Sequence, residues 1–113
     1  MSVRVHLNRP LVLEEVTRSA DGAGGYSETW VPLGTLWADL RARTGREARG
    51  ETGRLSTVPY KITVRAMPQG APQRPVPGQR FRDGARIFAI QAVAEADTGG
   101  KFLTCFAEEE LAL

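Results

Sequence analysis

The sequence predicts an all-β protein, a small antiparallel β-barrel or β-sandwich of about six to seven strands with one long projecting loop. Three observations lead to this fold class. Several runs alternate apolar and polar residues with a period of two, which is typical of half-buried strands. Glycine-containing turns separate these runs, as in small barrels and sandwiches. No run of ten residues has the spacing of an amphipathic helix.

Size and composition are those of one ordinary globular domain. The 113 residues fit a single domain, 1–113, with a modest core, and the net charge of +2 is lower than a dedicated nucleic-acid-binding domain usually carries. One cysteine, Cys105, allows no internal disulfide bond, and the N-terminus lacks the apolar stretch of a secretory signal. No apolar run approaches the roughly 20 residues that span a bilayer. We therefore expect a soluble protein, cytoplasmic when made, with no membrane partner.

The first third of the chain predicts a hairpin. Residues 1–10 alternate apolar and polar side chains and form either an N-terminal arm or an edge strand, because Pro10 cannot donate a ladder hydrogen bond. A strand is expected over Leu11–Arg18. The following Ser19–Gly25 contains three glycines and an Asp-Gly pair, which is typical of a hairpin turn. The return strand is expected over Tyr26–Leu33.

Pro32 and Gly34 then predict a bend or bulge, after which a further strand is expected over Thr35–Arg43. Every second side chain of that strand is apolar, so one face is suited to a core. That face consists of Leu36, Ala38, Leu40 and Ala42.

Residues 43–57 predict a long loop that projects from the body, since they contain three glycines and almost no apolar side chains. A helical turn near 46–49 is an alternative within it. Residues 41–54 carry five arginines against two glutamates, a local excess of three positive charges. Arginine is the side chain suited to bidentate contacts with phosphate. The five are Arg41, Arg43, Arg46, Arg49 and Arg54.

Two interpretations of this basic loop are open. In an isolated monomer the simpler one is a solvated loop of mixed charge, because exposed charges contribute little. If six or twelve copies formed a ring, the same loops would form a positive collar that acts on a phosphate backbone.

After the loop, a strand is expected over Tyr60–Ala66. The connection 67–79 holds four of the seven prolines, which excludes a helix or a central strand and predicts an extended, polyproline-like segment.

The last third predicts two further turns and strands. A short strand, Arg80–Arg82, turns at Asp83-Gly84 into Arg86–Val93, which is apolar on both faces and is expected near the centre of the sheet. The turn at 94–100 precedes a final strand over Lys101–Ala107. Residues 108–113 form an acidic tail that either has no regular structure or forms a helical turn.

No group of residues in the sequence indicates a catalytic or metal site. His6 and Cys105 are the only imidazole and thiol, and no third group is marked that would orient a catalytic base. Cys105 lies in an apolar strand, where a buried structural thiol is expected. Zinc favours four ligands, and Glu108–Glu110 are consecutive and so face different ways. We expect neither enzymatic activity nor a cofactor.

Six short motifs follow one another along the chain in a definite order. They are the turn Asp21–Gly25, Tyr26-Ser27-Glu28-Thr29-Trp30, Gly34-Thr35-Leu36-Trp37-Ala38-Asp39-Leu40, Gly45-Arg46-Glu47, Tyr60-Lys61-Ile62-Thr63-Val64-Arg65, and Asp83-Gly84 followed by Ile87-Phe88-Ala89-Ile90. In order and spacing the chain resembles the head–tail adaptor or head-closure (stopper, head–tail joining) proteins of tailed bacteriophages and gene transfer agents. The resemblance covers nearly the whole chain, although the connection 67–79 is longer than the family pattern.

The resemblance implies a structural protein without catalysis, a small β-barrel in the neck of a virion or phage-like particle that assembles in the bacterial cytoplasm. Six or twelve copies would form a ring beneath the portal and adaptor proteins and would dock the tail terminator or tail tube. The long loop would line or close the DNA channel and contact the DNA backbone. Trp30, Trp37 and Tyr60 are the candidates for subunit interfaces.

Two other functions fit parts of the same pattern. A tail-terminator or minor tail protein would share the ring. A free nucleic-acid-binding barrel would stack bases on Trp30 and Trp37, interleaved with the arginines.

Overall fold

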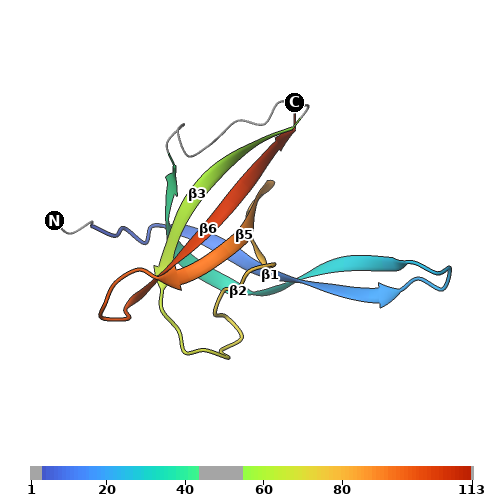
Figure 1. Cartoon of the computed structure of the whole chain (residues 1–113), viewed down its shortest axis with the longest axis horizontal. Coiled ribbons are helices and arrows are strands. Elements are labelled where there is room, and N and C mark those ends of the chain that lie inside the picture. The colour runs from blue at the N-terminus through green and yellow to red at the C-terminus, as the bar shows by residue number, and fades with distance from the viewer. Residues whose placement is uncertain (1–3, 44–54, 113) are drawn as a thin grey trace.

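A computed structural model describes residues 4–43 and 55–112, which are all-β with no helix among them (Figure 1). Accordingly, the described ranges contain no helix that could cross a membrane. The strands close an antiparallel barrel in the order β1-β2-β3-β6-β5-β4. The predicted all-β fold is confirmed. The six strands within the described ranges are β1 (Arg9–Ala20), β2 (Tyr26–Ala42), β3 (Leu55–Arg65), β4 (Arg80–Asp83), β5 (Arg86–Glu95) and β6 (Phe102–Ala112).

Side chains from one face of each strand fill the barrel. On β2 three of the four residues of the predicted apolar face point inward, with Leu36 and Ala38 buried and Leu40 packed against them. The fourth, Ala42, lies at the end of the strand and is exposed. Cys105 is fully buried in β6, as expected for a structural thiol. The buried hydrophobic residues are Leu11, Leu13, Leu36, Ala38, Ile62, Val64, Phe81, Phe88, Ile90, Leu103, Cys105 and Ala107.

β1 and β2 continue beyond the barrel as a two-stranded hairpin arm, which we define as residues 15–31. β1 pairs with β4 only from Val12 to Glu14, and beyond that point its ladder within the described residues is with β2 alone. Figure 1 shows the arm extending to the right, away from the barrel.

β2 is one strand of 17 residues, where the sequence predicts separate strands before and after Gly34. The predicted bulge is present: Leu13 pairs with Gly34 and Glu14 with Pro32, so Leu33 is the additional residue. The predicted interruption of the strand is wrong, because the ladder resumes on both sides of the bulge.

Gly34 is required at this bulge. Its φ is +151°, and a Cβ atom there would collide with the side chain of Gln73. The Gln73 amide donates a hydrogen bond of 3.2 Å to the Leu33 carbonyl and so fastens the connection 67–79 to the bulge. A side chain at position 34 would displace this contact.

The turn of the arm follows from the residues Asp21–Gly25. The Asp21 carboxylate accepts backbone N–H groups from Ala23 at 2.8 Å and from Gly25 at 3.1 Å. These bonds hold the pKa of Asp21 below its usual value. Gly22 and Gly24 have φ near +85°, a conformation that other residues rarely adopt.

The expected acidic tail, 108–113, is largely strand, since β6 continues to Ala112. The prediction of a loose or helical tail is wrong because β3 begins as early as Leu55, which pairs with Ala112 and provides a backbone partner along this stretch. For the same reason residues 55–57 of the predicted loop belong to β3. The remainder of that loop, 44–54, lies outside the described residues.

The strand expected near the centre of the sheet, Arg86–Val93, lies within β5, which has β4 on one side and β6 on the other. Because the barrel is closed, every strand has two neighbours and no strand is central. Phe88 and Ile90 point inward and Ala89 outward. A bulge between Ile90 and Ala92 then changes the alternation. The connection 67–79 contains neither helix nor strand. Its three hydrogen-bonded turns, Pro68–Ala71, Ala71–Arg74 and Val76–Gln79, replace the expected extended segment.

Candidate interaction surfaces

The N-terminal residues 4–8 lie along β2 outside the barrel. Asn8 donates a backbone hydrogen bond of 3.1 Å to the Ala38 carbonyl, and the His6 N–H donates one of 2.9 Å to the Asp39 carboxylate. Residues 4–8 thus form an N-terminal segment outside the strands, which is one of the two predicted alternatives. Arg9 and Pro10 already belong to β1. The N-terminal segment therefore covers part of the outer face of β2.

Arg41, the first of the predicted channel arginines, is used within the subunit. Its guanidinium donates to Asp39 at 2.8 and 3.0 Å and to the Arg4 carbonyl at 2.6 Å. The ion pair holds the pKa of Asp39 below, and that of Arg41 above, its usual value. Arg41 thus fastens the N-terminal segment to the barrel, while Arg43 lies just after β2 with its guanidinium 5.6 Å from the Phe106 ring. Arg46, Arg49 and Arg54 lie outside the described residues.

The three interface candidates differ in their surroundings. The Tyr60 ring packs edge-on against Phe88 at 5.1 Å, and its hydroxyl accepts a hydrogen bond from Arg86 at 3.1 Å. The Trp30 ring is covered by the Arg80 guanidinium at 4.1 Å. Trp37 is 56% exposed. Tyr60 and Trp30 therefore make contacts within the subunit, whereas most of the Trp37 ring is exposed to solvent.

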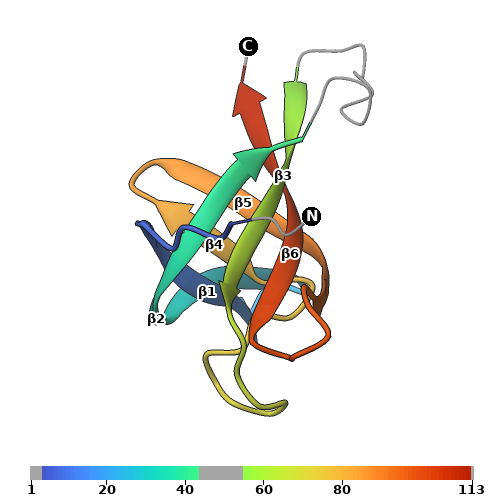
Figure 2. The same cartoon turned by 90° about the vertical axis from the view of Figure 1, so that its left-hand side faces the viewer.

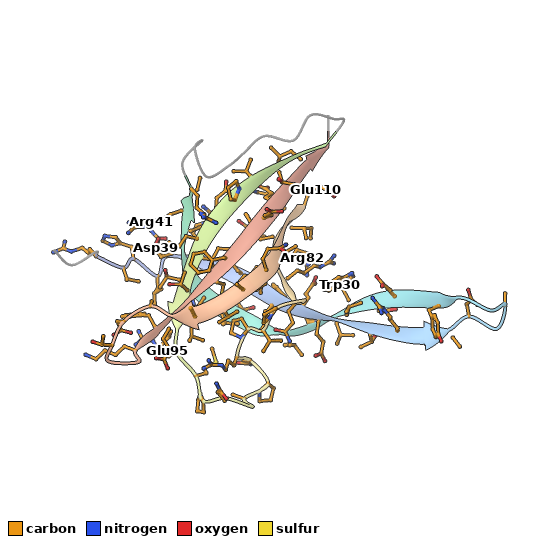
Figure 3. All side chains as sticks on the ribbon, viewed as in Figure 1. Trp30, Asp39, Arg41, Arg82, Glu95 and Glu110 are labelled. Carbon is orange, nitrogen blue, oxygen red and sulfur yellow. The ribbon has the colours of Figure 1, made fainter. Side chains whose placement is uncertain are left out.

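An ionic cluster lies at the root of the arm. Glu14 is 4% exposed, and its two carboxylate oxygens accept hydrogen bonds from Arg80 and Arg82, each at 2.7 Å. Burial alone would raise the pKa of Glu14, but the bonds from Arg82 and Arg80 keep it below its usual value. Because Arg80 also covers Trp30, the cluster joins the barrel strand β4 to the arm (Figure 3).

A second ionic cluster lies toward the end of the barrel where β6 ends. Arg86 donates to both Glu109 oxygens, at 2.8 and 3.0 Å, and its guanidinium lies 5.0 Å from the Phe88 ring. This pairing lowers the pKa of Glu109, which is buried, and raises that of Arg86. Glu109 is therefore part of the folded barrel and does not belong to a solvated tail.

The sequence indicated none of these cluster residues as important. The pattern Arg80-Phe81-Arg82 is a signal that could have been used, because two arginines flanking a buried phenylalanine on a strand share one face. Their counter-charge, Glu14, is 66 residues from Arg80, and spacing alone does not identify such a partner.

Within residues 4–43 and 55–112, no three His, Cys, Asp or Glu side chains lie close enough together to hold a metal ion. Burial raises the pKa of the Cys105 thiol to about 12, so it is not a nucleophile at neutral pH. The main hollows are open and shallow; the largest described, about 460 Å³, is bounded chiefly by the connection 67–79.

Comparison with known proteins gives consistent matches. The family described as Phage head completion protein matches residues 4–110. A chain from the structure of the virion of a native gene transfer agent (GTA) particle is 53% identical, with a TM-score of 0.82, over 99% of this chain and 100% of that chain. A Shigella flexneri 2a protein solved in solution shares the fold at 21% identity and a TM-score of 0.62, over 90% of this chain and 91% of that one. No curated protein matches.

Proposed function

Because the chain belongs to the phage head completion protein family, we propose that it forms a ring in the neck of a phage-like particle, between the portal or adaptor and the tail. Membership of this family makes the chain a structural virion protein of the head–tail region. The observation that carries the finer proposal is the likeness, at 53% identity over 99% of the chain, to a component of a GTA virion.

The barrel end from which the loop departs is the part that we assign to the DNA channel. β2 ends at Ala42 and β3 begins at Leu55, so both ends of the loop 44–54 are attached there. Ring closure would bring the loop arginines of all copies around one axis, where their field acts on the phosphate backbone. The charge of Arg41 is balanced by Asp39, so we leave it out of the proposed channel set. Arg43, Arg46, Arg49 and Arg54 are the proposed channel residues.

The neck assignment is tested by deleting the protein and imaging the particles by negative stain. We expect DNA-filled or emptied heads without attached tails, and separate tails in the same preparation. Intact tails on DNA-filled heads in the absence of this chain would refute the assignment. Expression of the intact chain from a plasmid should restore tailed particles and serves as the control.

The channel assignment is tested separately by replacing Arg43, Arg46 and Arg49 together with alanine. We expect particles that incorporate the variant but retain less DNA, measured as the fraction of filled, tailed heads. The matched control replaces the same three residues with lysine, which keeps the charge and should retain most of the DNA. Equal DNA retention in the alanine and wild-type particles would refute the role of the loop while leaving the neck assignment intact.

A further inference from the structure

The two faces of the hairpin arm differ in chemistry. On one face, cross-strand pairs place Thr17 opposite Thr29 and Ser19 opposite Ser27. The other face is apolar and aromatic apart from one exposed ion pair, Arg18–Glu28. Tyr26, at the tip of this second face, is 74% exposed. The pairs of the aromatic face are Val16–Trp30, Arg18–Glu28 and Ala20–Tyr26.

The same chain carries a groove that fits an aromatic side chain. It has a volume of about 350 Å³ and lies between the N-terminal segment, β2 and the connection 67–79. Leu7, Trp37 and Met67 provide apolar walls, and Arg65 provides a cation at its margin. A tyrosine presents an apolar ring and a polar hydroxyl, which suits a groove with apolar walls and a cation at its margin.

The arm cannot fill the groove of its own subunit. Tyr26 and Trp37 lie on one continuous strand, β2, and are 11 residues apart. At about 3.3 Å per residue the strand holds them roughly 35 Å from each other. Figure 2 shows the side of the barrel with β2, β3 and the N-terminal segment in front and the arm pointing away from the viewer. Tyr26 can therefore reach this groove only from another copy of the chain.

Charge identifies a second copy of this chain as a fitting occupant. The arm carries three carboxylates against one guanidinium, a net charge of −2. The groove is lined by one cation, Arg65, and by no carboxylate. Lys61 is exposed on the same strand as Arg65, and Arg41, its neighbour on β2, pairs with Asp39. Opposite charges on two surfaces of one chain favour contact between copies and set its direction.

We propose that the arm of one copy docks on the next, with Tyr26 seated in the groove formed by Leu7, Trp37 and Met67. The arm and the groove lie on different sides of the subunit, so the contact between copies is head-to-tail. Contacts of this class generate a ring when the rotation between copies closes. The Glu14–Arg80–Trp30 contacts hold the arm at a fixed angle to the barrel, which fixes the rotation between copies. This proposal rests on the proposed neck ring, for which it supplies the contact between subunits.

The test introduces Tyr26→Cys and Trp37→Cys into the full chain and treats purified particles with a short bis-maleimide. Cys105 does not interfere because it is buried. We expect a ladder of covalent multimers on a denaturing gel. Each single variant should give no ladder, and Tyr26→Cys combined with Val76→Cys, which is exposed outside the groove, should give none either.

Each outcome decides between the two proposals. Absence of the wild-type chain from particles overturns the proposed function and this contact with it. Presence of the double variant in particles without a ladder, or linkage of Tyr26→Cys to a different virion protein, overturns the contact alone. As a second readout, Tyr26→Ser should leave the urea midpoint unchanged but lower incorporation into particles roughly tenfold, as expected for an interface anchor. Val76→Ser should change neither, and equal incorporation of the two serine variants would also overturn the contact.

Discussion

Replacing Glu14 with glutamine tests whether the ionic cluster at the root of the arm stabilises the fold. Glu14 is 4% exposed and accepts one hydrogen bond of 2.7 Å from each of two arginines. Glutamine has nearly the same shape but only one accepting oxygen. Its amide nitrogen would face the guanidinium of the second arginine, and since both groups are hydrogen-bond donors, no bond could form between them. The substitution therefore removes one charge-assisted hydrogen bond and weakens the other.

The expected loss is about 2 kcal/mol of the free energy of unfolding. A hydrogen bond to a charged group contributes roughly 1.5–3 kcal/mol, and leaving a buried charge unpaired costs more. The side chains of Arg80 and Arg82 are 22% and 38% exposed, so both can recover some hydration, which places the loss in the lower part of that range. For a domain of this size, about 2 kcal/mol corresponds to a decrease in Tm of roughly 6–10 °C.

The assay is urea unfolding followed by tryptophan fluorescence, in which Trp30 reports directly because Arg80 covers its ring. The matched control is Glu28→Gln, which breaks the exposed Arg18–Glu28 pair on the same arm, with side chains 66% and 48% exposed. That change should cost about 0–1 kcal/mol. If the two variants lost the same free energy of unfolding, the reasoning would be refuted. Burial would then not affect how much an ion pair contributes to stability.

The same cluster predicts a pH dependence. The pKa of Glu14 is lower in the folded state than in the unfolded state, so its contribution is fully present above the unfolded-state value. The contribution is lost as the pH falls through the folded-state pKa. The stability difference between wild type and Glu14→Gln should therefore be constant near neutral pH and shrink in acid below about pH 4. A difference that grows in acid would contradict this sign.

Three further predictions concern the barrel. Gly34→Ala should destabilise by about 1–3 kcal/mol in urea unfolding, because φ is +151° and the new Cβ meets Gln73; an unchanged midpoint would argue against the strained bulge. Glu109→Gln should lower the free energy of unfolding by roughly 1.5–3 kcal/mol, because the Arg86 contacts are lost. A decrease as small as that of Glu28→Gln would instead indicate that residue 109 belongs to a solvated tail. The Cys105 thiol, with its pKa raised to about 12 by burial, should resist a thiol-reactive chromophore at pH 8 until urea unfolds the chain; rapid native labelling would be inconsistent with this burial.

Local patterns in the sequence predicted most strands and turns because strand alternation and turn chemistry are local properties. The Asp21–Gly25 turn and the bulge at Gly34 depend on residues that can be read directly. The continuity of β2 and the strand in residues 108–112 depend on distant partners in the ladder. No spacing rule fixes the register between strands that lie 50 residues apart.

The candidate surfaces were predicted less completely, for the same reason. Of the aromatic residues chosen from the sequence, Trp37 is the one whose exposure fits an interface, whereas Tyr60 is held by Phe88 and Arg86. The exposed Tyr26 went unnoticed because a hairpin that leaves the barrel has the same alternation as one that stays within it. Only the three-residue pairing of β1 with β4 reveals where the arm departs.

The length of β2 has a mechanical consequence. Tyr26 lies at one end of this strand, and at the other end the chain passes through Ala42 to Arg43. One hydrogen-bonded strand thus joins the tip of the arm to the origin of the loop. The additional residue at Leu33 lies where this strand passes from the barrel into the arm, and the Gln73 amide fastens it there. In the proposed ring, the contact between subunits and the residues assigned to the channel would therefore belong to a single structural element.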